Sequence, residues 1–264
     1  MIFAIPFPQI DPVLISFGPV AIRWYSLAYL AGLLLGWRLL RRLARRAPEV
    51  ADDAQVDDFL IWATLGIVLG GRLGYVLFYN LGYYLDNPLS MFAVWQGGMS
   101  FHGGLIGVIL ATLVFCRRRG IDLWLFSDRV ACVAPMGLFF GRLANFINGE
   151  LYGRVADVPW AVVFPRGGPD PRHPSQIYEA LMEGALLFLV LWWLAGNESH
   201  RQRAGFLTGV FMVGYGAART VAELFRQPDA HLGFLSFGST MGQWLSVPLL
   251  AFGAYLIFRS RPET

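Results

Sequence analysis

The stretch VACVAPMGLFFGRLANFINGELYG, residues 130–153, decides the fold class of this chain. Its first half is an apolar run of the kind that fills a membrane-spanning helix, which we expect over about 130–148. Its second half places Arg142 and Asn145 where that run would otherwise continue. A charged side chain at mid-helix in a bilayer costs at least about 2.5–3.5 kcal/mol, so it indicates a functional site by default.

The composition of the whole chain predicts a membrane protein. Of its 264 residues, 56% are hydrophobic and 15% are charged, which is more apolar than a soluble domain. Because about 20 apolar residues cross a hydrocarbon layer of about 30 Å, we predict an all-α polytopic membrane protein with seven transmembrane helices, in a single domain over residues 1–264. The helices are expected near residues 20–40, 59–79, 97–116, 130–148, 177–195, 205–225 and 241–258.

The arginines predict the orientation of these helices, because basic residues are more frequent in cytoplasmic loops. We therefore expect the N-terminus outside, the C-terminus in the cytoplasm, and external loops near 80–97, 149–176 and 226–240. The segment WAVVF within 149–176 stands among prolines and glycines, which predicts a small external cap with a short strand. The arginines that follow the first, third, fifth and seventh predicted helices are Arg41, Arg42, Arg45, Arg46, Arg117 to Arg119, Arg201, Arg203, Arg259 and Arg261.

Several function classes find no support in the sequence. The first twenty residues lack the basic start and the small-residue cleavage site of a signal peptide, so the first helix is expected to remain. Cys116 and Cys132 match no metal or disulfide spacing, and we interpret both as packing residues. The net charge of +3 is explained by the cytoplasmic loops. No basic stripe interleaved with aromatic residues indicates a nucleic-acid partner.

Three arginines inside predicted helices, Arg72, Arg142 and Arg219, are expected at one level of the membrane. At 1.5 Å per residue, each lies about 18–21 Å above the cytoplasmic end of its helix. His102, close to the outer start of the third helix, would point toward this level. Tyr215, Arg219 and Glu223 follow the spacing i, i+4, i+8 and therefore share one helix face.

A purely structural alternative is open for these arginines. They can reach outer headgroup phosphates, or pair with Glu223 and Glu150 to lock the helix bundle. For Arg23, near the outer start of the first helix, this structural alternative is the preferred one. For Arg142 and Arg219 it is the weaker one, because both lie deep and among small or polar residues.

Grouped arginines beside a histidine favour phosphate chemistry. Guanidinium groups bind phosphate bidentately and stabilise a departing phosphate. A histidine acts as a general base near neutral pH, which suits a thiol with a reference pKa of about 8.5. The sequence therefore predicts a phospholipid as substrate.

Beyond this chemistry, GRLANFINGELYG resembles the signature of the bacterial prolipoprotein diacylglyceryl transferases. Four further blocks are similar to family blocks in the same order, and the likeness spans nearly the whole chain, with Ile177 where the family often has Leu. These blocks are HGGLIG from His102, GGRLGYVLFYN from Gly70, HPSQIYE from His173 and YGAARTVAELFR from Tyr215.

The resemblance implies an enzyme of the bacterial cytoplasmic (inner) membrane, with its active site toward the outer leaflet. It would move the diacylglyceryl group of phosphatidylglycerol onto the lipobox cysteine thiol of a prolipoprotein signal peptide. A thioether forms and glycerol phosphate is released, as the first step of lipoprotein maturation. No metal and no organic cofactor is implied.

The resemblance also implies residue roles. Arg142 would bind the lipid phosphate, with Asn145, Glu150 and Gly153 shaping that site. His102 would be the general base for the thiol, and Arg219 would stabilise the leaving phosphate. The remaining substrate-binding residues would be Tyr25, Tyr215, Glu223 and Arg72.

The sequence offers alternative residues for the base and for the nucleophile. His173 is a rival base, although its place before Pro174 favours a role in organising the cap. Ser100 is the hydroxyl nearest to His102 and therefore the alternative nucleophile.

A lipid transporter would need polar residues through the cytoplasmic half of the bundle, where the sequence has almost none. An intramembrane protease or a metal-dependent transferase would need motifs that the chain lacks.

Overall fold

The computed structural model describes residues 5–8, 11, 13–17, 20–228 and 233–260. Arg261 and residues 229–232 of the loop predicted near 226–240 lie outside this part of the chain. The chain forms two compact units. Unit 1 comprises Met1–Leu40 with Asp128–Thr264, and unit 2 comprises Arg41–Ser127. The prediction of one catalytic domain over residues 1–264 stays a prediction.

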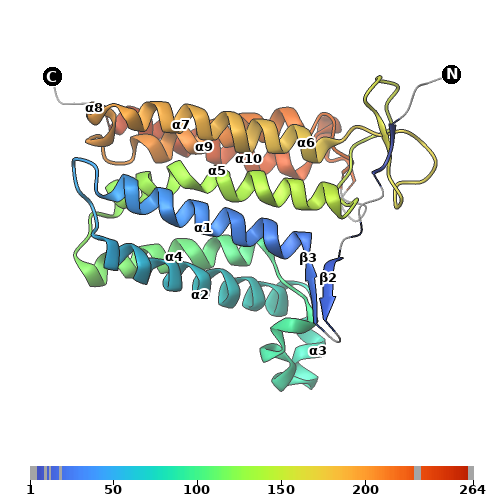
Figure 1. Ribbon diagram of the computed structural model, residues 1–264, viewed down its shortest axis with the longest axis horizontal. Helices are drawn as coiled ribbons and strands as arrows, with labels where there is room; N and C mark the ends of the chain where they lie inside the picture. Colours follow the sequence, from blue (N-terminus) through green and yellow to red (C-terminus); the bar gives the residue numbers. More distant parts are fainter. Residues whose placement is uncertain (1–4, 9–10, 12, 18–19, 229–232, 261–264) are drawn as a thin grey trace. The chain divides into compact units, whose positions relative to one another are not determined.

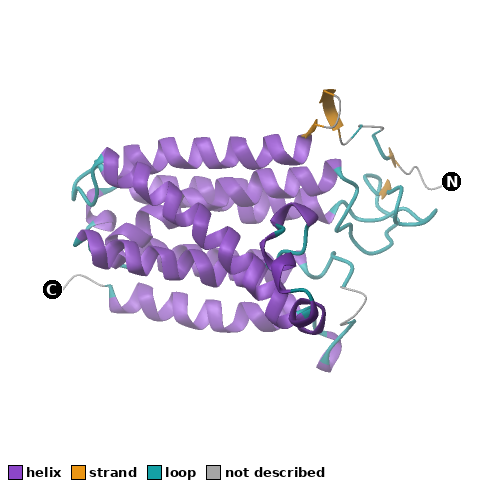
Figure 2. Ribbon diagram, turned by 90° about the horizontal axis from the view of Figure 1, so that it is seen from below, coloured by secondary structure: helices purple, strands orange, loops and turns teal. Residues whose placement is uncertain are grey.

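Helices occupy each of the predicted segments (Figure 1, Figure 2). A mostly helical chain with several candidate membrane spans is thus confirmed, whereas a crossing by seven helices and the orientation stay predictions. Among the described residues, five helices are long and apolar enough to cross a membrane, and α9 is a shorter apolar helix. The helices in these segments are α1 (Trp24–Ala44), α2 (Asp53–Phe78), α4 (Phe101–Arg119), α5 (Leu123–Ile147), α6 (Ser175–Glu179) with the π-helical η3 (Ala180–Leu186) and α7 (Leu187–Gly196), α9 (Phe206–Ala222) and α10 (Met241–Arg259).

Several helices begin elsewhere than predicted, because capping residues rather than hydropathy set their first turns. The α2 helix begins at Asp53, since the Asp52 side chain accepts a hydrogen bond from the Gln55 N–H at 2.8 Å and the Gln55 side chain accepts one from the Asp52 N–H at 2.9 Å. This reciprocal pair is a capping box. The α4 helix begins at Phe101 rather than near 97, because Gly97 and Gly98 have positive φ angles.

The α5 helix begins at Leu123 rather than near residue 130. Asp122 accepts a hydrogen bond from the Leu125 N–H at 2.8 Å and so starts the helix. The early turns contain Asp128 and Arg129, both fully buried. Because these two residues are charged, the apolar run used for the prediction starts only after them. Arg142 therefore lies further along its helix than the depth calculation assumed.

Short strands frame the N-terminal part and the predicted cap. The first helix starts at Trp24 because Val20–Arg23 forms β3, which pairs antiparallel with β2 (Val13–Phe17). Strand β1 (Ile5–Pro6) pairs parallel with β4 (Val162–Val163). The short strand predicted within WAVVF is thus present, and it ties the N-terminal segment to the segment 149–176.

Unit 2 is organised by close packing of α2 on α4. A Cβ atom on Gly66 would lie 2.6 Å from the Gly107 carbonyl oxygen, and one on Gly74 would lie 2.8 Å from the Gly103 Cα. Small residues at such positions allow two helix backbones to touch inside a membrane. The connection between the two helices contains α3 (Leu81–Asp86), η1 (Pro88–Phe92) and η2 (Val94–Gln96).

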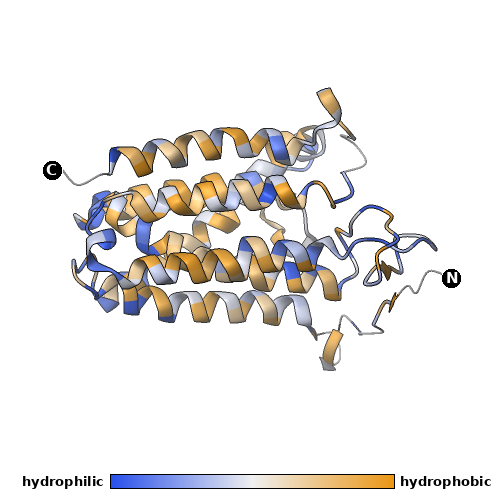
Figure 3. Ribbon diagram, turned by 90° about the horizontal axis from the view of Figure 1, so that it is seen from above, coloured by the Kyte–Doolittle hydropathy of each residue, from blue (hydrophilic) through white to orange (hydrophobic). Residues whose placement is uncertain are grey.

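Unit 1 brings α5, the helix 175–196, α9 and α10 together. A Cβ atom on Gly184 would lie 2.7 Å from the Phe139 Cβ, so η3 and α5 approach closely. At the start of α9, the Asp128 carboxylate accepts hydrogen bonds from the N–H groups of Gly205 and Thr208 at 2.9 and 2.7 Å. Figure 3 shows helices that are largely hydrophobic along their length, with hydrophilic residues at their ends and at a few internal positions.

Candidate active site

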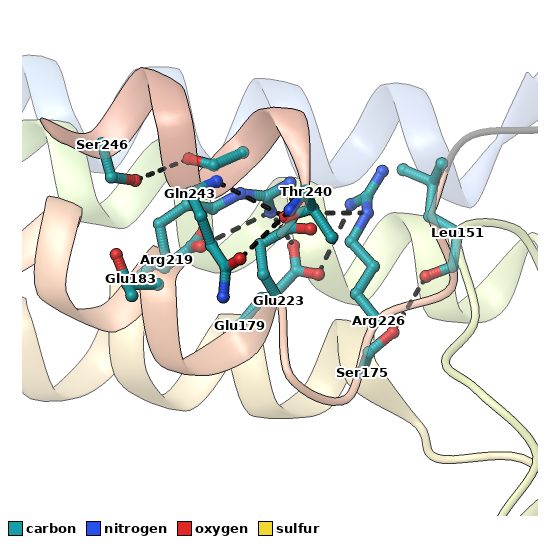
Figure 4. Close-up of polar contacts among 12 residues, drawn as sticks. Leu151, Ser175, Glu179, Glu183, Arg219, Glu223, Arg226, Thr240, Gln243 and Ser246 are labelled. Atoms are coloured by element: carbon teal, nitrogen blue, oxygen red, sulfur yellow. Dashed lines mark hydrogen bonds and ion pairs between the residues drawn. The ribbon is translucent and has the colours of Figure 1, made fainter. Parts of the chain in front are cut away.

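Three arginines and three glutamates form a buried cluster in unit 1, which we call the Arg–Glu cluster. Figure 4 shows how Glu179, Glu183, Arg219, Glu223 and Arg226 converge. The glutamate side chains are at most 4% exposed, and the arginine side chains are between 9% and 17% exposed. The members are Arg142 on α5, Glu179 at the end of α6, Glu183 on η3, Arg219 on α9, and Glu223 and Arg226 at the C-terminal end of α9.

Glu179 is the centre of the cluster. Its Oε2 lies 2.7 Å from Arg142 Nε and 3.1 Å from Arg219 Nη1. Its Oε1 lies 3.4 Å from Arg226 Nη1. One carboxylate thus joins α5, α6 and α9.

Glu183 lies one helical turn further along the same helix. Its Oε2 lies 3.3 Å from Arg142 Nη2, and its Oε1 lies 3.7 Å from Arg219 Nη1. This Oε1 is buried and accepts no hydrogen bond from the part of the chain that the structure describes. Arg219 also pairs with Glu223, at the spacing i, i+4.

The local backbone explains why both carboxylates face the arginines. The π-helical turn η3 begins directly after Glu179 and contains Glu183. Such turns are uncommon and often occur at functional sites. Gly184, the next residue, admits α5 to within contact distance, which brings Arg142 within reach of Glu179.

The structure therefore joins Arg142 and Arg219 as the sequence predicted, and adds the acids that balance them. With all groups ionised, the charges of the three guanidinium groups and the three carboxylates cancel. The structural alternative finds partial support, because Arg219 does pair with Glu223. Glu150 has other partners: its Oε1 accepts hydrogen bonds from Asn145 Nδ2 at 2.8 Å and from Asn148 Nδ2 at 3.4 Å.

Gly153 lies where the cap segment crosses the end of α9. Its N–H donates to the His173 carbonyl at 2.9 Å, and a Cβ atom there would lie 2.6 Å from the carbonyl oxygens of both His173 and Phe225. The next residue, Arg154, donates to the carbonyls of Glu223 and Arg226, each at 2.9 Å. This close crossing fixes the chain that carries Glu223 and Arg226.

His173 organises the same region. Its Nδ1 lies 3.1 Å from the Tyr178 hydroxyl, and its ring packs edge-on against Phe225 with centroids 5.2 Å apart. Burial lowers the pKa of His173 below its ordinary value, although the nearby Asp157 acts in the opposite direction. These contacts support the cap-organising interpretation over a role as base.

Two predicted tyrosines are partly buried in unit 1. The Tyr25 hydroxyl donates to the Tyr29 hydroxyl at 3.2 Å. Tyr215 is half-buried on α9, one helical turn before Arg219. Their predicted roles in substrate binding stay predictions.

Arg72 is buried in unit 2 and held by backbone carbonyls. Its Nε donates to Met91 at 2.9 Å, and one Nη2 hydrogen bond reaches Ser90 at 2.7 Å. Further carbonyl acceptors are those of Ala93, Gly97 and Gly98. Its guanidinium carbon also lies 5.1 Å from the centre of the Tyr84 ring. These contacts shape the segment before α4, and the predicted role of Arg72 as a substrate ligand stays a prediction.

His102 is exposed in the first turn of α4, in unit 2, with its ring edge-on to Phe101. Its predicted role as base stays a prediction. Ser100 is buried and caps α4: its hydroxyl accepts a hydrogen bond from the Gly103 N–H at 3.2 Å, while its own N–H donates to Gly71 at 2.9 Å. These hydrogen bonds explain the presence of a serine at position 100 as a helix cap, without a role as nucleophile. Arg23 is exposed at the end of β3.

Sequence reasoning missed Glu179, Glu183 and Arg226 as site residues. Glu179 and Arg226 end two of the blocks that carried the resemblance, and Glu183 lies within a predicted span. The cost of a buried charge, applied to the arginines, holds equally for carboxylates. Applied to both signs of charge, it would have found Glu183, which lies further inside the predicted span than Glu179. Among the described residues, no group of His, Cys, Asp or Glu side chains is arranged to hold a metal ion, and Cys116 and Cys132 are buried and free.

Comparisons with known proteins agree with one another. A family described as prolipoprotein diacylglyceryl transferase matches residues 12–259. A phosphatidylglycerol–prolipoprotein diacylglyceryl transferase of Paramagnetospirillum magneticum is 60% identical over 258 residues, covering 97% of this chain and 96% of the relative. Its namesake in Rhodospirillum rubrum is 59% identical over 263 residues, covering 99% and 96%. That of Azospirillum brasilense is 59% identical over 260 residues, covering 98% and 97%.

Proposed function

The chain belongs to the prolipoprotein diacylglyceryl transferase family, and from this membership we propose how its residues carry out the reaction. The protein is a transferase that moves the diacylglyceryl group of phosphatidylglycerol to prolipoproteins, the first step of lipoprotein lipidation. The observation that carries our proposal is the Arg–Glu cluster, which concentrates guanidinium groups inside an apolar helix bundle.

We place the phosphate of the donor lipid against Arg142 and Arg219. Both side chains keep partial exposure, 17% and 14%, and among the described residues no hydrogen bond or ion pair engages Arg142 Nη1 or Arg219 Nε. Glu179 holds the two guanidinium groups side by side. Such pre-positioned charges stabilise a phosphate more strongly in a dry site than in water. Asn145, Glu150 and Gly153 shape the end of α5 and the cap beside this site.

The reaction is a substitution at carbon. The thiolate of the acceptor cysteine forms a bond to the diacylglycerol carbon that carries the phosphate, and the bond from this carbon to the phosphate oxygen breaks. The bonding electron pair leaves with that oxygen, so glycerol phosphate gains negative charge, which Arg219 stabilises. The thiol proton goes to His102, an assignment that rests on the family resemblance and on the acid–base chemistry of histidine.

The membrane arrangement is part of the same proposal. We place the seven helices across the bacterial inner membrane, with the segment 149–176 as an external cap and the active site toward the outer leaflet. The acceptor is then the lipobox cysteine of a signal peptide that reaches the site through the bilayer. The arginines in the last turns of α1, α4 and α10 support this orientation.

Mass analysis of a lipobox peptide, incubated with purified protein and phosphatidylglycerol, tests the reaction. The wild type is expected to add one diacylglyceryl group, and a peptide with serine in place of cysteine should gain nothing. His102→Ala should slow the addition at least about 100-fold, the lower range for loss of a general base. A folded His102→Ala protein with the full rate would exclude His102 as the base.

A further inference from the structure

The carboxylates of the Arg–Glu cluster reduce its attraction for anions. Arg142 and Arg219 face Glu179 and Glu183, and Arg219 also faces Glu223. Arginines placed only for the tightest phosphate binding would not need this many counter-charges. Glu183 is the notable one, because its side chain is fully buried while its Oε1 accepts no hydrogen bond from the described residues.

Such a group is costly to the fold. A buried polar atom without a hydrogen bond destabilises a protein by about 1–3 kcal/mol, and a buried ion pair is often no more stable than an apolar replacement. An explanation in terms of stability therefore fails for Glu183. One Glu183 oxygen lies within 4 Å of Arg142 and the other within 4 Å of Arg219, the two arginines assigned to phosphate. This position favours the explanation that Glu183 influences which phosphate these arginines bind.

The donor and the product of the reaction differ in charge. The phosphate of phosphatidylglycerol is a diester with one negative charge, whereas a phosphate monoester carries about 1.5–2 negative charges near pH 7. A nearby carboxylate repels the monoester more, because Coulomb energy grows with the product of the charges. Without such a carboxylate, the arginines would hold the product more tightly than the donor.

We propose that Glu183 is a specificity-determining residue of the transferase: it sets the phosphate site to hold a phosphodiester and to release a phosphomonoester. The inference rests on the proposed placement of the donor phosphate at Arg142 and Arg219. Glu179 contributes to the same repulsion, but it also positions three arginines, so Glu183 is the residue through which the effect can be measured.

Two soluble headgroup analogues test the inference as inhibitors of peptide lipidation. Glycerol phosphate is the monoester, and glycerophosphoglycerol is the matching diester. In Glu183→Gln, which keeps the shape and removes the charge, the inhibition constant of glycerol phosphate should fall at least about tenfold, since a unit charge a few Å away in a partly buried site is worth at least this factor. The inhibition constant of glycerophosphoglycerol should fall less. The ratio of the glycerol phosphate constant to the glycerophosphoglycerol constant is therefore expected to be lower than in the wild type.

Matched variants separate charge from packing. Glu183→Asp alters packing but keeps the charge, so its ratio should stay that of the wild type. Glu198→Gln, an exposed site on α8 (Glu198–Arg201), should change neither constant. A folded Glu183→Gln protein with an unchanged ratio would overturn the inference while leaving the transferase activity standing. Absence of lipidation by the wild type would instead contradict the proposed function.

The wild type alone provides a second test that needs no folded variant. With all six groups ionised, the cluster carries no net positive charge, so glycerol phosphate should inhibit no more strongly than glycerophosphoglycerol, despite its larger charge. Inhibition by the monoester about tenfold stronger than by the diester would contradict the inference.

Discussion

At Gly153 the backbone leaves no room for a side chain. An alanine Cβ would lie 2.6 Å from two carbonyl oxygens that belong to different segments, those of His173 and Phe225. Because both are backbone atoms, neither can move without displacing its own segment, which is the stretch before α6 for His173 and the end of α9 for Phe225. We expect Gly153→Ala to lower the melting temperature in detergent and to reduce lipidation more than tenfold.

A control at a glycine inside a helix isolates this effect. Gly137 lies in α5 with no atom within 4 Å of its Cβ position, so Gly137→Ala should be neutral or slightly stabilising, because alanine favours helix. Equal behaviour of the two variants would show that the crossing at Gly153 is not as tight as described.

The candidate site was partly predictable at the level of residues. Arg142 and Arg219 were found because a positive charge inside an apolar run is costly whatever its surroundings. Their partner Glu179 was not found, since it stands at the start of a span, where a charge costs less. Only the π-helical turn after Glu179 and the close approach at Gly184 bring it to the arginines, and neither is encoded in hydropathy.

Among the helices, the packing of α2 on α4 depends on small residues. A Cβ atom on Gly66 would lie 2.6 Å from the Gly107 carbonyl oxygen, so Gly66→Val has to separate the two helices. The separation would displace the start of α4, which carries His102. We therefore expect a lower melting temperature and at least a tenfold loss of lipidation, measured on the same preparation.

The matched control is Gly36→Val in α1, where no atom lies within 4 Å of the Cβ position. This change should leave the rate of lipidation within about twofold of the wild type. Full activity and unchanged melting of Gly66→Val would show that unit 2 does not require contact between the α2 and α4 backbones.

The sequence predicted the positions of the helices better than their ends. Apolar runs located every predicted segment, because burial in lipid imposes hydrophobicity along the span. The starts of α2 and α5 differ from prediction, since polar caps at Asp52 and Asp122 extend these helices beyond the apolar run. Strand pairing of Val20–Arg23 shortens the start of α1, and such long-range pairing leaves no periodic signal in a helix-like sequence.

For the whole molecule, the two units carry different parts of the proposed chemistry. Unit 1 holds the Arg–Glu cluster, and unit 2 holds His102, with Arg72 supporting the segment that precedes it. Lipidation is therefore expected to fail when either unit is disturbed, even if the other keeps its packing. The charge balance of the cluster, and not the arginines alone, is what we expect to decide which phosphate is held.

The central claim is that Arg142 holds the donor phosphate, and the rate of peptide lipidation by Arg142→Gln tests it most directly. This rate should fall at least about 100-fold at saturating peptide, in line with the loss of a pre-positioned charge. The melting temperature should also fall, because the change removes one guanidinium partner from the buried carboxylates of Glu179 and Glu183. Arg166→Gln, an exposed arginine of the cap segment, should keep the full rate. A folded Arg142→Gln protein that lipidates the peptide as fast as the wild type would contradict the account.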